Sequence, residues 1–236
     1  PHWFQYATER YWHYHEQGLD FIFPGHTHYP EEFTWLERPP ICISVLGNSK
    51  ILTNPCISVV GTREPNQVSI QWIEQELRKF MSKNNAVLVS GGARGIDQAA
   101  HFAAIRNSKP TVVVVPAGLK KLYPNNLNEW KSLVLETGGC LISEYSPLTE
   151  MLKSRFEQRN RLIAQLGSIL LIVEGKLRSG TMLTAKQAIL QSKTMGVVPA
   201  HPLQIGFSGN LSLLDLGAIP VRDALDLQVL FDRSCH

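Results

Sequence analysis

Four basic residues and one aromatic residue lie close together between positions 153 and 161. The basic residues are Lys153, Arg155, Arg159 and Arg161, the aromatic residue is Phe156, and the one acid among them is Glu157. Lysine and arginine side chains neutralise phosphates, and an exposed ring offers a face on which a nucleic-acid base can stack. This composition is typical of a surface that holds a polyanion.

Three more turns rich in glycine or basic residues follow apolar runs. They are Gly61-Thr62-Arg63, residues 90–97 and residues 176–181. In the second turn, Gly91, Gly92 and Gly95 allow the backbone N–H groups to approach a ligand, and a helix starting near residue 96 adds the positive end of its dipole. The same glycines can instead serve only to pack that helix closely on the preceding strand. Both interpretations stay open at this stage.

The arginines of these turns have two uses that compete. Arg63 follows a flexible Gly-Thr pair and can reach a phosphate with both arms of its guanidinium group, but it can also form a surface ion pair with Glu64. Arg159 and Arg161 can likewise hold loops in place through backbone carbonyls or through Glu144. We expect at least one of these two arginines to be structural.

Signatures of catalysis are missing from the glycine-rich turns. Residues 90–97 lack the full G-x-G-x-x-G spacing, residues 175–181 are not a G-x-x-x-x-G-K-[ST] loop, and the chain has no G-x-S-x-G turn. Glu144 and Glu174 are the only credible acids for an activity, and we expect each to pair with Arg159 or Arg161. The sequence therefore predicts no catalytic residue and no cofactor.

Two histidine pairs are the natural candidates for a metal site. His13 and His15 form one pair, and His26 and His28 form the other. A metal needs three or four ligands that converge on it, and neither pair has a cysteine or an acid at a suitable spacing. We therefore predict no metal site.

The composition is that of an ordinary globular protein. Of the 236 residues, 44% are hydrophobic and 18% are charged, and the net charge of +3 means that affinity for nucleic acid must come from a local patch. Cys42, Cys56, Cys140 and Cys235 show no C-x-x-C spacing, which favours reduced thiols and a cytoplasmic location. No apolar run approaches about 18 residues, so we predict no membrane span.

From residue 41 onward, short apolar runs alternate with amphipathic segments. The predicted strands are 41–45, 57–60, 86–90, 111–115, 140–143, 168–173 and 195–199. The predicted helices are 67–83, 96–106, 126–136, 160–166, 181–191 and 212–216. Strands that are apolar throughout are typical of a sheet with helices on both faces, so we predict an α/β fold with a doubly wound, mostly parallel sheet.

Five loops begin where a predicted strand ends. They are residues 61–63, 90–97, 116–118, 143–145 and 174–181. Ligands of open α/β sheets bind outside the carboxyl ends of the strands. We therefore expect the five loops to gather along one edge of the sheet.

The first part of the chain differs from the rest. Residues 3–17 are compatible with a helix that ends at Gly18, and an irregular stretch follows as far as Pro39-Pro40. We therefore predict a short helical extension over residues 1–38 and the α/β domain over residues 39–236.

In their order along the chain, these features resemble the DprA/Smf family of DNA-processing proteins over about residues 29–221. The matching pieces are Tyr29-Pro30, Pro39-Pro40, Gly47-Asn48, Val60-Gly61-Thr62-Arg63, residues 90–97 with Ala100-His101, Gly118-Leu119, Tyr123-Pro124, Ile142-Ser143-Glu144, residues 156–161, Val173-Glu174, Ser179-Gly180-Thr181, Thr184-Ala185 and Gly209-Asn210. Each piece alone is weak, but the ordered set is highly specific.

The resemblance implies an extended Rossmann-like domain that binds and protects single-stranded DNA without sequence preference. It also implies a homodimer and the loading of RecA recombinase in natural transformation or recombination, and the missing catalytic residues predict that the protein is not an enzyme. The DNA-binding residues expected from the resemblance and from the basic turns are Gly61, Thr62, Arg63, Ser90, Gly91, Gly92, Arg94, Lys153, Arg155, Phe156, Asn160, Arg161, Arg178, Ser179, Gly180 and Asn210.

Two departures and two rival interpretations accompany this resemblance. The family's Val-Pro-Gly ends here in Ala200, and Asn125 stands where a lysine often follows the Tyr-Pro pair. A LOG-type phosphoribohydrolase, which binds a nucleotide, carries P-G-G-x-G-T-x-x-E, but Gly180-Thr181 is followed by Thr184 at the position of the glutamate. The other rival is an interaction module whose basic edge binds an acidic protein.

Overall fold

Nine strands form one mostly parallel sheet in the computed structural model, which describes residues 2–235. The strands are β1 (Leu19–Ile22), β2 (Ile43–Gly47), β3 (Cys56–Val60), β4 (Val87–Ser90), β5 (Thr111–Val114), β6 (Cys140–Ser143), β7 (Ile169–Ile172), β8 (Thr194–Val197) and β9 (Ile219–Pro220). Their order across the sheet is β1-β2-β6-β5-β4-β3-β7-β8-β9. From β6 to β9 in this order all neighbours are parallel, whereas β2 is antiparallel to both β6 and β1.

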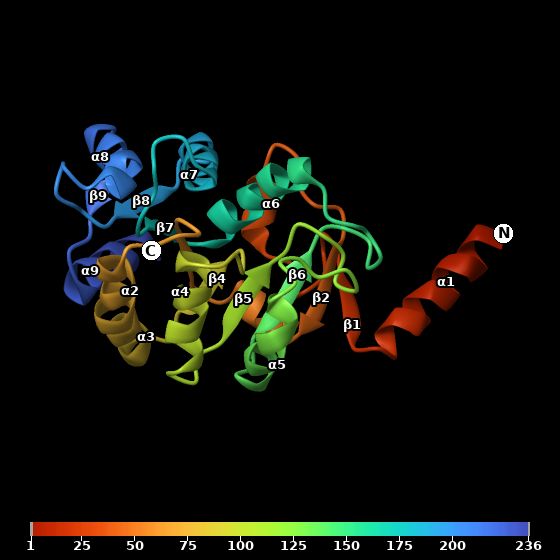
Figure 1. Cartoon of the computed structure of the whole chain (residues 1–236). Helices are drawn as coiled ribbons and strands as arrows, with labels where there is room; N and C mark the ends of the chain where they lie inside the picture. The colour runs from red at the N-terminus through yellow and green to blue at the C-terminus, as the bar shows by residue number, and fades with distance from the viewer. Residues whose placement is uncertain (1, 236) are drawn as a thin grey trace.

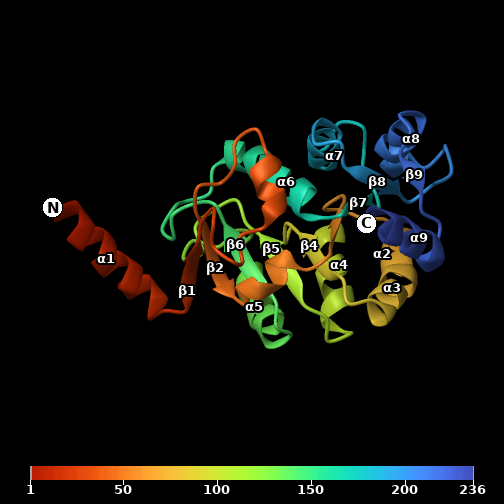
Figure 2. The ribbon, with the colours of Figure 1, turned by 180° about the vertical axis from the view of Figure 1, so that it is seen from behind.

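Helices cover both faces of the sheet (Figure 1). One face carries α6 (Lys153–Leu166), α7 (Gly180–Leu190) and α8 (Ser208–Asp215). The other face carries α4 (Ile96–Ile105), α5 (Leu127–Glu136), α9 (Ala224–Ser234) and one continuous helical run made of α2 (Gln67–Trp72), a π-helical turn (Ile73–Leu77) and α3 (Arg78–Lys83). Helix α1 (His2–His15) projects from the edge of the sheet beside β1, as the view from behind also shows (Figure 2).

The two helical layers explain why the central strands are apolar at every position. In β7, Ile169 and Leu171 pack toward α2, α3, α4 and α9, whereas Leu170 and Ile172 pack toward α6 and α7. All four side chains are fully buried. A strand covered on both faces has no position left for a polar side chain in contact with water, so its sequence loses the alternation of a half-exposed strand.

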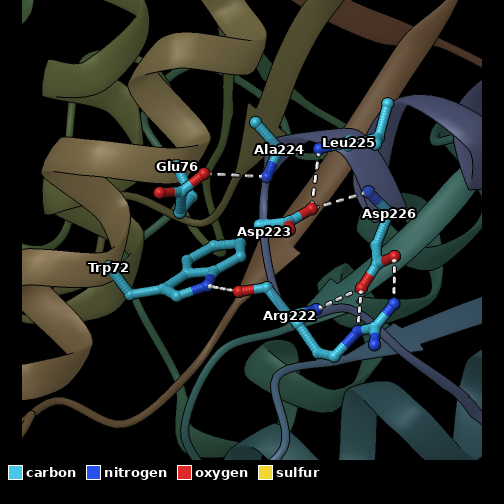
Figure 3. A network of polar contacts seen from close by, with 7 residues as sticks. All are labelled: Trp72, Glu76, Arg222, Asp223, Ala224, Leu225 and Asp226. Atoms are coloured by element: carbon cyan, nitrogen blue, oxygen red, sulfur yellow. Dashed lines mark hydrogen bonds and ion pairs between the residues drawn. The ribbon is translucent and has the colours of Figure 1, made fainter.

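Helix α9 is fixed to the α2 region by a network of polar contacts (Figure 3). The Asp223 carboxylate caps α9 by accepting hydrogen bonds of 2.9 Å from two backbone N–H groups of its first turn. Glu76 accepts a third, at 2.9 Å, from the backbone N–H of Ala224, and the Trp72 indole N–H donates to the Arg222 carbonyl at 2.8 Å. The N–H groups that a helix leaves open at its start are thus satisfied from two elements.

The predicted α/β fold with a doubly wound, mostly parallel sheet is confirmed, and each predicted strand has an observed counterpart. Strands β1 and β9 were not predicted: β1 lies in the range predicted to be a helical extension, and β9 has only two residues. The structure places β1 in the sheet, so the sheet reaches into the range 1–38. The division at residue 38 remains a prediction, and residues 1 and 236, which end the predicted ranges, lie outside the described residues.

Candidate nucleic-acid interface

The chain switches faces of the sheet between the neighbouring strands β3 and β7. β3 leads to α2 on one face and β7 leads to α7 on the other, so the loops after them diverge. A crevice at such a switch point is where open α/β sheets bind ligands. The loops that follow β3, β4, β5, β6 and β7 all leave the same edge because these strands are parallel. The prediction that five loops gather along one edge is confirmed.

A cavity of about 780 Å³, called here the main hollow, opens at this switch point. Its walls are the loop after β3, the first three turns of α6 and the start of α7. The residues that line it are Val60, Gly61, Thr62, Arg63, Glu64, Ala93, Asp97, Lys153, Ser154, Phe156, Glu157, Arg159, Asn160, Ile163, Ser179, Gly180, Thr181, Leu183 and Thr184. The main hollow therefore joins the loop after β3 to parts of α6 and α7 that lie about 90 residues or more further along the chain.

Two exposed cations and a half-buried ring stand at the mouth of the main hollow. Arg63 and Lys153 are both exposed. The guanidinium group of Arg63 lies 5.3 Å from the centroid of the Phe156 ring, within the range of a cation–π contact. The Tyr123 ring meets the Phe156 ring edge-on, with 5.5 Å between centroids. Within the described residues Arg63 forms no ion pair with Glu64, so its charge is available to a ligand.

The start of α7 offers backbone donors to the same space. Ser179 and Gly180 line the main hollow, and α7 begins at Gly180. The first N–H groups of a helix have no partner within it, and the helix dipole makes this end favourable for an anion. The hydroxyl of Ser179 donates to the Lys176 carbonyl at 2.7 Å, which fixes the turn before the helix. Arg178 is exposed on this turn.

Arg159 is buried beneath the main hollow and is structural. The residue is 4% exposed, and its side chain donates to the Gly91 carbonyl at 2.9 Å, to the Val114 carbonyl and, through Nε, to the side chain of Asn160 at 3.1 Å. Burial lowers the pKa of Arg159 to about 10, and the nearby Asp97 carboxylate opposes that shift. These contacts tie α6 to the ends of β4 and β5. The prediction that at least one of Arg159 and Arg161 is structural is confirmed.

Arg161 is held on another side of α6. It forms an ion pair with Glu144, and the two side chains are only 18% and 13% exposed. Burial raises the pKa of Glu144, while the charge of Arg161 opposes the rise. The predicted pairing of Glu144 is thus confirmed. Arg161 does not line the main hollow, and its predicted contact with DNA stays a prediction.

Glu174 does not pair with either arginine, so that prediction was wrong. The residue is 2% exposed, and its carboxylate accepts hydrogen bonds from the backbone N–H of Asn66 at 2.8 Å, from the Asn66 amide at 2.6 Å and from the Ser69 hydroxyl at 2.7 Å. Glu174 lies at the switch point, where the start of α2 presents open N–H groups and a positive dipole end to it. The acid therefore joins the loop after β7 to the loop after β3.

The glycine-rich loop after β4 acts mainly in packing. A side chain at Gly91 would overlap the Arg159 guanidinium group, and Gly92 has φ +69 and would bring a Cβ to 2.8 Å from Val113. The Ser90 hydroxyl is buried and donates to the Val59 carbonyl at 2.6 Å. These two glycines allow close packing against Arg159 of α6 and Val113 of β5 rather than against α4, and their predicted contact with DNA stays a prediction.

Two more predicted residues have internal partners. The Asn210 amide is fully buried, accepts from the Gly175 N–H at 2.9 Å and donates to the carbonyls of Val173 and Val198 at 3.0 and 2.9 Å. Arg155 lies over the Tyr145 ring, 4.9 Å from its centroid. The hydrogen bonds of Asn210 therefore fix the conformation of the loop after β7, and its amide is not available to a ligand.

The main hollow brings together half of the predicted DNA-binding residues: Gly61, Thr62, Arg63, Lys153, Phe156, Asn160, Ser179 and Gly180. Arg94 and Arg178 are exposed outside it, and Arg155 is half-buried outside it. Thr181, Thr184 and Tyr123 were not among the predicted DNA-binding residues. All three lie in matching family pieces, Ser179-Gly180-Thr181, Thr184-Ala185 and Tyr123-Pro124, so a signal for each of them was present.

The described residues contain neither a cluster of metal ligands nor a helix that could span a membrane. Among residues 2–235, no group of three or more histidine, cysteine, aspartate or glutamate side chains is placed to hold a metal ion. Over the same residues, the helices are too short or too polar to cross a membrane.

The chain matches known proteins over most of its length. The family model for DNA recombination-mediator protein A matches residues 20–231. DNA processing protein DprA of Streptococcus pneumoniae (strain ATCC BAA-255 / R6) is 31% identical over 204 residues, which is 86% of this chain and 71% of that protein. The X-ray structure of the S. pneumoniae protein superimposes with a TM-score of 0.83 at 29% identity, covering 90% of this chain and 74% of the other.

A second solved structure is similar over almost the whole of its own chain. It is that of DNA processing protein A from Helicobacter pylori, a protein with a single-stranded DNA binding mode. The TM-score is 0.79 at 29% identity, with 91% of this chain and 96% of that chain covered.

Proposed function

The chain belongs to the family of DNA recombination-mediator protein A, the DprA/Smf family, and from this premise we propose that it binds single-stranded DNA in the main hollow, without sequence preference. The observation that carries the proposal is the juxtaposition of Arg63, Lys153 and the Phe156 ring at the mouth of a cavity at the switch point. The similarity to the H. pylori protein supports the same ligand.

Each part of the interface has a role in this proposal. Arg63 and Lys153 contact phosphates, and Phe156 stacks on a base. The open N–H groups at the start of α7 receive a further phosphate, and Arg178 lies beside them on the preceding turn. None of these groups distinguishes one base from another, because phosphates are the same at every nucleotide and every base has a flat face.

Replacing Arg63 or Arg178 by alanine should weaken binding to all sequences alike. Each loss of a phosphate contact should flatten the slope of log affinity against log salt by about 0.7 to 1 unit. Fluorescence anisotropy with labelled single-stranded and double-stranded oligonucleotides over a salt series measures both quantities. Arg233→Ala, which removes an exposed arginine from α9, is the matched control and should leave affinity and slope unchanged. Wild-type affinity that does not depend on salt would contradict the proposal.

Replacing Phe156 by alanine should reduce the binding free energy by about 1–3 kcal/mol, because a stacking surface is lost. The salt slope should change little, in contrast to Arg63→Ala, since no charge is removed. Phe156→Tyr keeps the ring and should retain most of the affinity. The competing role is an anchor for α6, because the ring is half-buried against Tyr123. A large fall in melting temperature with unchanged affinity would assign Phe156 to that role.

The finer parts of the function rest on the family. We propose that the protein protects the bound strand and loads RecA recombinase onto it in recombination or natural transformation, in the cytoplasm and as a homodimer. The description of the family as a recombination mediator supports the loading step. All four cysteines are free, which supports a reducing compartment. Exposed Leu216, Ile219 and Leu225, in and around the edge strand β9, support self-association.

We assign no catalytic role to the interface. Glu144 is bound to Arg161, and Glu174 accepts three hydrogen bonds from the start of α2, so both acids stabilise loops. Purified protein incubated with nucleoside monophosphates or labelled DNA, with and without divalent metal, should give no product. Product that forms with the wild type and disappears with Glu144→Gln or Glu174→Gln would overturn this assignment.

A further inference from the structure

A second, smaller cavity lies on the loop between β5 and α5. Its volume is about 260 Å³, and it is called here the lysine hollow. Side chains with hydrogen-bonding groups dominate its walls: Lys120, Lys121, Tyr123, Asn125, Asn128 and Glu150. The lysine hollow belongs to the same edge of the sheet as the main hollow, because its loop follows the carboxyl end of the parallel strand β5.

A pair of aromatic rings connects the two hollows. Phe156 lines the main hollow and Tyr123 lines the lysine hollow, and their rings are in edge-on contact at 5.5 Å between centroids. A ligand that leaves the main hollow over Phe156 therefore meets the Tyr123 ring before it reaches the lysines. Rings that follow one another between patches of positive charge are typical of the path of a single strand.

The two lysines of the lysine hollow favour the binding of an anion, and the one acid there, Glu150, disfavours it. Lys120 and Lys121 are both exposed. The Lys121 ammonium group forms an ion pair of 2.8 Å with Glu150, whose side chain is 72% exposed. Lys120 has no ion pair within the described residues, and its charge is free to meet a phosphate. Asn125 and Asn128 add neutral amide groups that can donate hydrogen bonds.

We propose that a DNA strand too long for the main hollow continues over Tyr123 into the lysine hollow, where Lys120 and Lys121 bind the phosphates of its next nucleotides. This inference rests on the proposed function and adds a second subsite to it. If the second subsite exists, long strands contact Lys120 and Lys121, whereas strands short enough to fit in the main hollow do not. Glu150 weakens the binding of phosphate at this subsite, because it forms an ion pair with Lys121.

The test is a length series of oligothymidines, from about 4 to about 20 nucleotides, bound to the wild type and to the Lys120→Ala/Lys121→Ala double variant. One phosphate contact corresponds to a slope of about 0.7 in a single strand, hence to about a fivefold change in affinity at 0.1 M salt. The double variant should lose about fivefold or more for long strands, with a flatter salt slope, and nothing for the shortest strand that the wild type binds. Glu150→Gln should strengthen the binding of long strands only.

A matched control variant tests whether the loss is specific to the lysines of the lysine hollow. Lys79→Ala/Lys83→Ala removes two exposed lysines from α3 and should change binding at no length. Equal affinity of wild type and double variant for every strand would overturn the second subsite, and so would an equal loss at every length. Failure of the wild type to bind any single strand would instead overturn the proposed function itself.

Discussion

Replacing Arg159 by alanine should lower the free energy of unfolding by about 3–5 kcal/mol. The guanidinium group is buried and supplies donors to the carbonyls of Gly91 and Val114 and to Asn160, so its removal leaves buried acceptors without partners. The removal also takes away the cation nearest to buried Asp97, whose pKa is already raised by burial. Urea denaturation followed by tryptophan fluorescence measures the loss.

Three further variants separate the contacts of Arg159 from its charge. Arg159→Lys keeps the charge but loses the fork that reaches several acceptors at once, so it should recover only part of the stability. Combining Arg159→Ala with Asp97→Asn should cost less than the sum of the single changes, because the two residues interact. Lys153→Ala, an exposed position on the same helix, should change stability by less than about 0.5 kcal/mol. If Arg159→Ala lowered the free energy of unfolding no more than Lys153→Ala does, the structural role of Arg159 would be refuted.

Replacing Glu174 by alanine should lower the free energy of unfolding by about 2–4 kcal/mol and should also weaken DNA binding. Three hydrogen bonds to a buried carboxylate are lost, and the donors of Asn66 and Ser69 are left without partners. DNA binding suffers because the same contacts hold the loop that carries Arg63. Urea midpoints report the loss of stability, and anisotropy titrations without urea, at a temperature at which the variant is folded, report the loss of DNA binding.

Glutamine at position 174 tests whether the negative charge is needed. An amide offers one acceptor atom where the carboxylate uses both of its oxygens, and its NH2 group would face the donors of Asn66 or Ser69. We therefore expect Glu174→Gln to lose more than half of what alanine loses. Glu157→Ala, an exposed acid at the main hollow, is the control that should leave stability unchanged. A glutamine variant as stable as the wild type would show that the acid is not required.

The positions of the strands along the chain and the gathering of the loops could be predicted, because both follow from apolar runs and from parallel connections, whereas the order of the strands across the sheet was not predicted. The start of α6 could not be predicted in the same way. The sequence indicated a helix from residue 160, but α6 begins at Lys153. Its first turns carry polar and charged side chains, and the buried residues Arg159 and Asn160 are themselves polar. Hydrophobic periodicity gives no signal for such a helix.

The roles of the basic residues on α6 illustrate what one sequence cannot decide. Lys153 is exposed at the main hollow, Arg159 is buried beneath it, and Arg161 is paired with Glu144. From the sequence alone, these three residues are all simply basic residues on one helix. Which one faces a ligand depends on the rotation of the helix and on carbonyls supplied by β4, β5 and their loops, which are distant in the sequence. Likewise α9 was missed although Asp223 precedes apolar residues at helical spacing.

The pairing of β3 with β7 determines when, during synthesis of the chain, the sheet can be completed. Ile57 lies opposite Ile169, so about 110 residues of chain must be in place before this pair can close. Strands β3 to β6 have shorter separations and can associate earlier during synthesis, because the entropy of closing a loop grows with its length. The main hollow needs the loop after β3, α6 and the turn before α7 together. A nascent chain therefore acquires its interface only after α6, β7 and the start of α7 have been made, and until β7 is in place the apolar edge of β3 is open to pairing with other chains.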